Sequence, residues 1–514
     1  MSRPRTLHEW LAGSARQHPT KVAIDDRGVP VTYAELDRRS DELARGLTQA
    51  GYAVGDRVVT LTGNSAEHVV LFLACARTGL VLVPMSWRLT PSELGPMMAT
   101  TRPSLVVAED ELQRLARASL DRAGLAVPMT APGSTGVEST VPVRTPGPER
   151  GPEPRGPVDD DPLLVVFTSG SEASPKGVVL SHANVASNSL AMAEATGLTH
   201  CDVVLATLPQ FHVAAWNCQP LAAWWHGATV VLERSFEPAR VLRLVADRGV
   251  TTMMCVPTQL HLLAADPTFP RADLVSLRHA VVGGASMPES LRRVWAQHGV
   301  QVGQGYGLTE ASANVLYLPP SEAADHPEAV GWPYPGVEVR LVGEDGPVEG
   351  VGQGELQVRG PGVFTGYLHD PERTAAALDG EWLRTGDLAA RDQDGCHRIV
   401  DRLKHIYISG GENVAPAEVE AVLVSHPLVA DAAVVAVPDE VWGEVGVAFV
   451  QPVPGARLTV EDVLAHAREH LAGFKAPREV HVLEDLPRTG IGKIARADLR
   501  RRVEVVPAVG RGAR

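Results

Sequence analysis

Residues 163–177 read LLVVFTSGSEASPKG, and this stretch decides the fold class. The apolar run Leu163–Phe167 predicts a buried strand, and a loop of hydroxyls, one glycine and Lys176 follows it. Such a loop offers backbone N–H groups, hydroxyl donors and a positive charge to a polyphosphate. It differs from a Walker A loop, because Pro175 precedes the lysine and Gly177 follows it. A solvated turn is the alternative for this loop taken alone.

On both sides of this stretch, helical periods alternate with short β-branched runs. Strands separated by helices favour parallel pairing, so the predicted class is α/β, with a large N-terminal domain built of βαβ subdomains. We expect helices over 7–17, 33–49, 66–78 and 213–225, and strands over 56–61, 79–83, 203–207, 228–232, 251–255 and 279–282.

Changes in composition predict the domain organisation. A tract rich in proline and glycine, about 128–161, cannot bury an apolar face and is expected to be a surface loop. Short strands and glycine-rich turns predict a β-rich subdomain over about 331–403, which closes an N-terminal domain of residues 1–403. Mixed helix and strand patterns return in 404–503, which we predict to be a smaller mobile α+β lid domain, and 504–514 form a tail.

Composition excludes several classes of protein. The chain has 514 residues and a formal net charge of −14, so it lacks the basic surface that a nucleic-acid partner requires. Its 5 cysteines include no CxxC pair, which favours reduced thiols and a cytoplasmic location. Charge and proline interrupt residues 1–19, and Arg77 interrupts the most apolar stretch, 69–85, so neither a signal peptide nor a membrane span is predicted.

Four further motifs follow the phosphate loop in order. They are YGLTE at 306–310, WLRTGD at 382–387, DRLK at 401–404 with ISGGEN at 408–413, and PRTGIGKI at 487–494. Together with the loop, they make residues 7–501 resemble the acyl-adenylate-forming (AMP-binding) superfamily. Phe211–Val213 and the ISGGEN motif are most similar to those of bacterial fatty-acyl-CoA synthetases. One departure is Ser171–Ala173, which stands where the family usually has Thr-Thr-Gly.

The resemblance implies an acid–thiol ligase that works in two steps. A carboxylate attacks the α-phosphate of MgATP, and a thiol, that of CoA, then captures the acyl-adenylate. The carboxylate and the triphosphate repel each other, so the site must neutralise both. The resemblance assigns catalytic roles to Lys493, Thr309, Glu310 and His212, with Glu310 as the Mg²⁺ ligand.

The resemblance also assigns binding residues. The nucleotide site would comprise Thr168, Ser169, Gly170, Ser171, Lys176, Gly283, Gly284, Ala285, Gly305, Tyr306, Gly307, Thr309, Asp387, Ile399, Arg402 and Lys493. The CoA tunnel would use Ser409, Gly410, Gly411 and Glu412, which a rotation about the hinge Lys404 would bring in. Candidates for the acyl pocket are His212, Trp216, Asn217, Val256, Gly307 and Ala311.

Each role has a structural alternative. Tyr306, His212 and Trp216 could be core residues, Lys404 an ordinary linker residue, and Asp387 a turn residue. The position of Trp216 is compatible with a short or aryl-shaped acyl pocket, and the sequence does not decide which acid is activated.

Other functions remain as competing hypotheses. Gly303–Gly307 weakly resembles a dinucleotide fingerprint, but Leu308 replaces its third glycine, which argues against an oxidoreductase. A non-catalytic nucleotide-binding protein is a distant alternative. Within the family, the acceptor could instead be a carrier protein, or nitrite could be activated and coupled to an arylamine. A monomer or a homodimer is expected.

Overall fold

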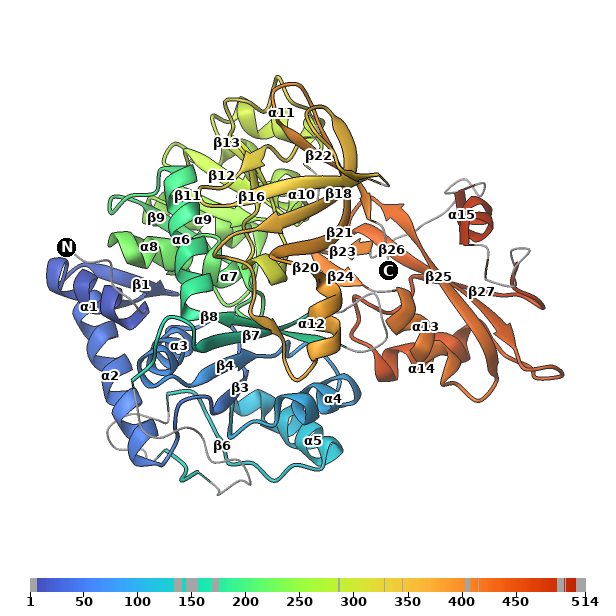
Figure 1. Cartoon of the computed structure of the whole chain (residues 1–514), viewed down its shortest axis with the longest axis horizontal. Helices are drawn as coiled ribbons and strands as arrows, with labels where there is room; N and C mark the ends of the chain where they lie inside the picture. The colour runs from blue at the N-terminus through green and yellow to red at the C-terminus, as the bar shows by residue number, and fades with distance from the viewer. Residues whose placement is uncertain are drawn as a thin grey trace. The chain divides into compact units, whose positions relative to one another are not determined.

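A computed structural model of the chain describes residues 7–133, 141–144, 156–168, 175–284, 287–327, 329–343, 345–402, 407–414, 416–487, 494 and 496–504. The chain divides into two compact units (Figure 1). The larger comprises Met1–Trp87, Leu94–Phe167 and Gly177–Leu403, and the smaller comprises Arg88–Glu93, Thr168–Lys176 and Lys404–Arg514.

A nine-stranded sheet forms one layer of the larger unit, in the order β15-β14-β13-β12-β11-β9-β10-β1-β2. The six strands from β13 to β1 in this order are parallel, as the βαβ pattern predicts, and β2, β14 and β15 are antiparallel additions at the edges. The strands are β1 (Val22–Asp26), β2 (Val29–Thr32), β9 (Val203–Ala206), β10 (Thr229–Leu232), β11 (Thr252–Cys255), β12 (His279–Val282), β13 (Gln301–Tyr306), β14 (Leu316–Leu318) and β15 (Trp332–Pro333).

A seven-stranded sheet forms a second layer, in the order β19-β8-β7-β4-β3-β5-β6. Its strands β7, β4, β3, β5 and β6 are parallel. The quoted stretch provides β7, and β8 begins at the lysine of that stretch. The strands are β3 (Arg57–Leu61), β4 (Val81–Pro84), β5 (Leu105–Ala108), β6 (Met129–Thr130), β7 (Pro162–Thr168), β8 (Lys176–Ser181) and β19 (Gly366–Tyr367).

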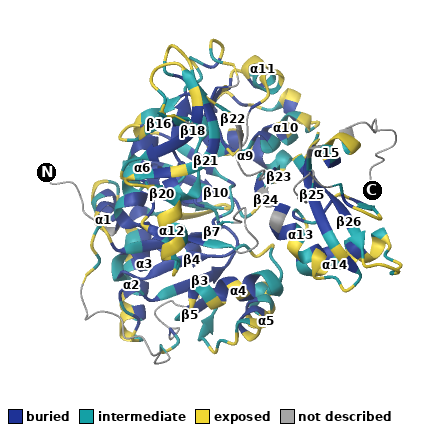
Figure 2. Ribbon diagram, turned by 45° about the vertical axis from the view of Figure 1, so that its right-hand side comes forward, coloured by how far each residue is buried: buried dark blue, intermediate teal, exposed yellow. Residues whose placement is uncertain are grey.

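Helices fill the space between these two sheets and cover their outer faces. Residues of the nine-stranded sheet alternate between two cores: Val204 and Val230 join helices α1, α2, α3, α6 and α8, whereas Leu205 joins α9, α10 and α11. Figure 2 shows the buried residues concentrated along the strands. The helices are α1 (Leu7–Gln17), α2 (Tyr33–Gln49), α3 (Ala66–Thr78), α4 (Pro91–Thr101), α5 (Gln113–Ala123), α6 (His182–Thr196), α7 (Ala214–Asn217), α8 (Pro220–His226), α9 (Pro238–Arg248), α10 (Pro257–Ala265) and α11 (Glu289–Gln297).

The helix predicted over 213–225 is wrong in one respect, because two helices, α7 and α8, occupy this segment. Pro220 opens α8, and Gln219 before it has φ −148°, outside the helical region. A residue before proline is pushed out of the α conformation by the pyrrolidine ring, so the chain breaks here although its apolar pattern is continuous.

A third sheet, antiparallel, lies in residues 338–402 and belongs to the larger unit. Its order is β17-β16-β18-β21-β20, with β22 paired to β21. The hairpin β21–β22 turns at residues 392–395, as the Asp-Gln-Asp-Gly sequence indicates. Its elements are β16 (Glu338–Gly343), β17 (Gly346–Pro347), β18 (Gly352–Arg359), α12 (Pro371–Ala377), β20 (Leu378–Asp379), β21 (Trp382–Arg391) and β22 (His397–Arg402).

The smaller unit has a sheet of its own. Strands run in the order β24-β23-β26-β25, and β27 pairs with β26. Valine and alanine residues of the long β25–β26 pair alternate between two cores, one closed by α13 and α14 and the other by α15. The elements are β23 (Tyr407–Ser409), β24 (Glu412–Val414), α13 (Pro416–Val424), β25 (Val429–Asp439), β26 (Gly443–Pro452), α14 (Val460–His470), β27 (Glu479–Val482) and α15 (Arg496–Glu504). The predicted fold class is therefore confirmed.

Parts of the proline-rich tract, predicted as a surface loop over about 128–161, are anchored to the larger unit. Strand β6 pairs with β5, and the Tyr52 hydroxyl donates to the Pro142 carbonyl at 3.0 Å. Arg144 donates to both carboxylate oxygens of Asp56 at 2.7 and 2.9 Å. Residues 134–140 and 145–155 lie outside the described part. No described helix is long and apolar enough to cross a membrane.

The first testable prediction concerns this anchor. Replacing Arg144, whose side chain is 19% exposed, leaves the 8% exposed Asp56 carboxylate without its two-bond partner. We expect Arg144→Met to lower the free energy of unfolding of the larger unit by about 1–3 kcal/mol, measured from the urea midpoint. Arg45→Met is the matched control, because the Arg45–Asp41 pair on α2 is exposed, and its midpoint should stay near that of the wild type. Equal midpoints for the two variants would contradict the anchoring role.

Candidate active site

The carboxyl-terminal edge of the nine-stranded sheet gathers several predicted residues. Because β11, β12 and β13 are parallel neighbours, the segments after them meet at one edge. Val256 follows β11, and its Cγ1 lies 3.7 Å from where a Cβ on Gly284 would be. A Cβ on Gly283 would lie 2.8 Å from the side chain of Met254, so the backbone passes closely here. Ala285 lies outside the described residues.

Tyr306 and Asp387 are joined by a hydrogen bond. Tyr306 ends β13, and its hydroxyl donates to Oδ2 of Asp387 on β21 at 2.6 Å. The Asp387 side chain is only 4% exposed, so this bond is formed away from bulk water. The sequence placed these two residues in one nucleotide site on motif order alone, and the structure brings them into contact.

Hydrogen bonds of Thr385 hold the backbone around Asp387. The Asp387 N–H donates to Oγ1 of Thr385 at 3.1 Å, and the Thr385 hydroxyl donates to the Leu356 carbonyl at 2.6 Å. Gly386 between them has φ +71°, a conformation that favours glycine. Across the hairpin, Ile399 pairs with Ala389 and contacts the core. Asp387 pairs with Arg402 in the backbone ladder, and only the backbone of Arg402 is described.

Glu310 lies in a short 3₁₀ turn, Thr309–Ala311, directly after β13. Its Oε1 accepts a hydrogen bond from the Tyr367 hydroxyl at 2.9 Å. Burial, and secondarily the Glu310 charge, raises the pKa of Tyr367 far above its usual range, so this hydroxyl stays protonated and donates. Oε2 accepts no hydrogen bond from the described residues, and the half-buried carboxylate therefore offers a hard oxygen that suits Mg²⁺.

The turn after Glu310 has an unusual backbone. Ser312 has φ +58° and Ala313 has φ +93°, although neither is glycine. Gly307 packs against this turn so closely that a Cβ there would lie 1.5 Å from the Ala313 carbonyl oxygen. A turn held in this conformation needs compensating contacts, because each such residue costs about 1–3 kcal/mol.

Three buried asparagines provide these contacts. Asn188 of α6 donates to the carbonyls of Ala311 and Asn314 at 3.1 and 3.0 Å. Asn217 of α7 donates to the Ser312 carbonyl at 2.9 Å, and Asn314 donates to Oδ1 of Asn188 at 2.7 Å. We call Asn188, Asn217 and Asn314 the asparagine cluster. The sequence did not reveal this cluster as a unit, and Asn217 was predicted as a pocket residue instead.

Trp216 and His212 differ in their surroundings. Trp216 is fully buried, stacks on Phe72 with ring centroids 4.5 Å apart, and donates to the Gln210 carbonyl at 2.9 Å. This placement favours the core alternative for Trp216. His212 is half-buried beside the Phe211 ring, at 4.7 Å between centroids, and Ala311 is 3% exposed.

The phosphate loop is described only at its two ends. Thr168 ends β7 and Lys176 begins β8, both half-buried. Ser169, Gly170 and Ser171 lie outside the described residues, as do Lys404 and Lys493. Their predicted roles therefore stay predictions.

In the smaller unit, the predicted CoA residues form a tight hairpin between β23 and β24. Gly410 and Gly411 have φ +58° and +83°, and a Cβ on Gly410 would lie 2.5 Å from the Trp442 ring, so only glycine fits there. Ser409 and Glu412 on either side are buried, and Arg88 pairs with Glu412 at 3.1 Å.

Comparison with solved structures defines the class of protein. An amide bond synthetase from Marinactinospora thermotolerans superimposes with a TM-score of 0.86 and 31% identity, covering 97% of this chain and 99% of that chain. The fold is that of an adenylate-forming enzyme.

Family models and curated relatives agree with this class. The AMP-binding enzyme model matches residues 11–368, and the model of the AMP-binding enzyme C-terminal domain matches 418–493. A feruloyl-CoA synthase from Amycolatopsis sp is 39% identical over 97% of this chain and 99% of its own. A long-chain-fatty-acid–CoA ligase from Mycobacterium tuberculosis is 33% identical over 92% of this chain and 93% of its own. The chain belongs to the AMP-binding enzyme family, as the motifs predicted.

Membership of this family establishes the reaction class. The chain is an AMP-forming acid ligase of the acyl-CoA synthetase class, which activates a small-molecule carboxylic acid with ATP. The oxidoreductase and non-catalytic alternatives are thereby excluded.

The second testable prediction concerns the asparagine cluster. Asn314→Ala removes two amide donations that hold the turn after Glu310. We expect the rate of ATP–pyrophosphate exchange to fall about 10–100-fold, because displacing Glu310 by about 1 Å is enough for such a loss. Gln219→Ala is the matched control: it truncates another fully buried amide, bonded to Thr252 at 2.8 Å, outside the cluster. If both variants lose thermal stability and exchange activity to the same extent, the positioning role is wrong.

Proposed function

We propose that this chain activates an aryl-substituted carboxylic acid and transfers the acyl group to CoA. The hydrogen bond between Tyr306 and Asp387, with Glu310 four residues after Tyr306, supports an adenylation site in the larger unit. The relative named for feruloyl-CoA is more similar, and over more of the chain, than the relative named for long-chain fatty acids. The motifs alone suggested a fatty acid. The higher identity to the feruloyl-CoA relative, over nearly the whole chain, favours an aryl acid instead.

In the first step, the carboxylate oxygen attacks the α-phosphorus of ATP and pyrophosphate leaves. The Asp387 carboxylate would accept hydrogen bonds from the ribose hydroxyls, and the Tyr306 ring would stack on adenine while its hydroxyl keeps Asp387 oriented. The glycines after β12 and β13 would let the nucleotide approach the backbone. The phosphate loop and Lys493 would neutralise the charge that opposes this attack.

Glu310 fits the metal requirement of this step. Its described contact leaves one carboxylate oxygen for a cation, and Tyr367 holds the other. With Thr309 beside it, Glu310 would hold Mg²⁺, which supplies charge neutralisation on the phosphates. The residues present therefore suit this ion.

In the second step, the CoA thiolate attacks the carbonyl carbon of the acyl-adenylate and AMP leaves. We propose that the hairpin of Ser409–Glu412 lines the path of the thiol, because its glycines present bare backbone. A rotation of residues 404–503 about Lys404 would exchange Lys493 for this hairpin between the two steps.

A substrate screen tests the proposed function. Pyrophosphate release would be measured with ferulate, a long-chain fatty acid and nitrite, each with and without Mg²⁺ and CoA. We expect ferulate to give at least about tenfold higher kcat/KM than the fatty acid, equivalent to about 1.4 kcal/mol of transition-state binding. Release should require Mg²⁺, and feruloyl-CoA should accumulate when CoA is present. Faster turnover of the fatty acid or of nitrite would overturn the substrate class.

An amine acceptor is the second candidate for the transfer step. The structural likeness to an amide bond synthetase favours it, and it overlaps with the arylamine alternative raised by the motifs. Adding an arylamine and CoA together to the preformed adenylate separates the two acceptors. Amide as the main product would replace CoA in the proposal.

The third testable prediction concerns Lys493, whose role is proposed on the PRTGIGKI motif. Lys493→Ala should lower adenylate formation by at least about 100-fold, because it removes a charged donor at the α-phosphate, and should leave capture of a preformed acyl-adenylate nearly unchanged. Single-turnover assays measure the rate of adenylate formation and the rate of adenylate capture separately. Lys21→Ala, whose ammonium donates to the His200 carbonyl in the larger unit, is the control for loss of a lysine. Adenylation at the wild-type rate in Lys493→Ala would refute the assignment.

A further inference from the structure

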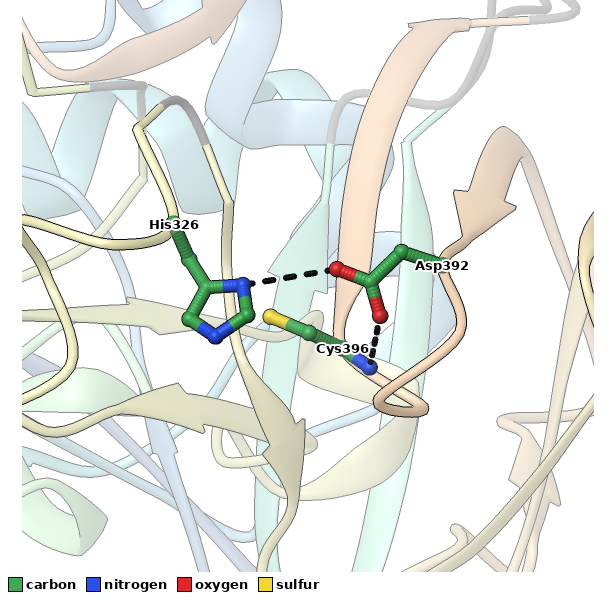
Figure 3. Close-up of side chains that lie close together, drawn as sticks. All are labelled: His326, Asp392 and Cys396. Atoms are coloured by element: carbon green, nitrogen blue, oxygen red, sulfur yellow. Dashed lines mark hydrogen bonds and ion pairs between the residues drawn. The ribbon is translucent and has the colours of Figure 1, made fainter.

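Three side chains with metal-binding atoms lie together outside the nucleotide site. His326, Asp392 and Cys396 each direct one ligand atom into a group whose members all lie within 4.8 Å of one another (Figure 3). Asp392 and Cys396 flank the turn of the β21–β22 hairpin, and His326 comes from the segment that follows β14. We call these three residues the hairpin triad.

The spacing of the triad is close to that of a tetrahedral site. Nδ1 of His326 and Oδ2 of Asp392 are 3.3 Å apart. Ligands at about 2.0–2.1 Å from Zn²⁺ in tetrahedral geometry are roughly 3.3 Å from each other, so this edge is already formed. The Cys396 sulfur lies within 4.8 Å of both atoms, and a Zn–S bond near ~2.3 Å calls for separations of roughly 3.5 Å.

The surroundings hold two of the three ligands in place. Oδ1 of Asp392 accepts from the backbone N–H groups of Asp394 and Cys396 at 3.0 and 2.9 Å, which leaves Oδ2 directed at His326. The Trp332 ring packs edge-on to the His326 ring at 5.1 Å and donates to the Asp394 carbonyl at 3.0 Å. Both ligand orientations are therefore fixed by contacts that do not use the ligand atoms.

Burial and charge favour a cation with affinity for sulfur. Cys396 is 2% exposed, and its backbone N–H donates to Oδ1 of Asp392 at 2.9 Å. A divalent cation bound to the sulfur would displace the thiol proton to solvent. The Asp392 side chain is 47% exposed, which leaves room for water as a fourth ligand.

We propose that the hairpin triad is a structural binding site for a borderline-soft divalent cation of the Zn²⁺ type. One nitrogen, one carboxylate oxygen and one thiolate suit Zn²⁺ or Co²⁺ better than Mg²⁺, which takes oxygen ligands. The bound cation fastens the turn of β21–β22 to the segment after β14. The site is independent of the proposed substrate and acceptor.

Cobalt titration tests the proposal directly. Tag-free protein, treated with chelator and dialysed, is titrated with Co²⁺, which gives a sulfur-to-metal charge-transfer band only when a thiolate is a ligand. We expect the band to saturate at one Co²⁺ per chain, Zn²⁺ to displace it, and Zn²⁺ to raise the thermal midpoint. Binding at Glu310 gives no such band, because its donors are oxygens. Absence of the band at saturating Co²⁺ would overturn the proposal.

Three variants locate the ion. Cys396→Ser should abolish the band, and Asp392→Asn, which keeps the Oδ1 acceptor of the turn, should weaken binding at least about tenfold. Cys201→Ser is the matched control, because Cys201 is exposed and its sulfur lies 3.4 Å from the His200 ring, a pair able to bind metal adventitiously. Loss of the band in Cys201→Ser, or its survival in Cys396→Ser, would refute the site. If Cys396→Ser does not fold, the affinity of Asp392→Asn decides, and an unchanged value refutes the site.

Discussion

The turn after Glu310 is the constraint on which the candidate site depends. It contains two consecutive non-glycine residues with positive φ, and it presses against Gly307 without room for a side chain. The asparagine cluster holds this turn from α6 and α7, two helices more than 90 positions away in sequence. Buried amides with satisfied donors specify one geometry, because each unmade bond would cost about 1–3 kcal/mol. The positions of Glu310 and of the end of β13 therefore depend on hydrogen bonds from α6 and α7 rather than on the local sequence.

Local signals explain which elements the sequence predicted well. The helices over 33–49 and 66–78 match α2 and α3, since each begins after a hydroxyl cap, Thr32 or Ser65, that accepts from the third residue of the helix. Long-range contacts explain what composition could not show. Arg144 contacts Asp56 at a separation of 88 residues, so composition predicted a surface loop but not the contact that anchors it. The break between α7 and α8 had a local signal in Pro220, which the continuous apolar pattern concealed.

In the candidate site too, the order of the motifs in the sequence predicted which residues belong together but not which atoms are in contact. Motif order placed Tyr306 and Asp387 in one site, but it could not show that the tyrosine hydroxyl is bonded to the carboxylate. Trp216 and Asn217 follow the Phe211–Val213 motif and were natural pocket candidates. The structure uses one in the core and the other in the asparagine cluster. Asparagines separated by 29 and 97 positions share no helical or strand period, so no pattern in the sequence joins them.

The β21–β22 hairpin carries residues of two proposed sites at its two ends. Asp387 lies five residues before Asp392, about 17 Å along an extended strand. At that separation, a divalent cation at the turn would change the energy of the Asp387 charge by roughly 2 kcal/mol at an effective dielectric constant of about 20, and by roughly 0.5 kcal/mol in a water-like dielectric. Because Asp387 is buried, the larger value applies, and a cation at the turn would favour the ionised form of this carboxylate. A cation at the hairpin triad acts on the turn it fastens, and Asp387 depends on Tyr306 and Thr385 at its own end of the strand.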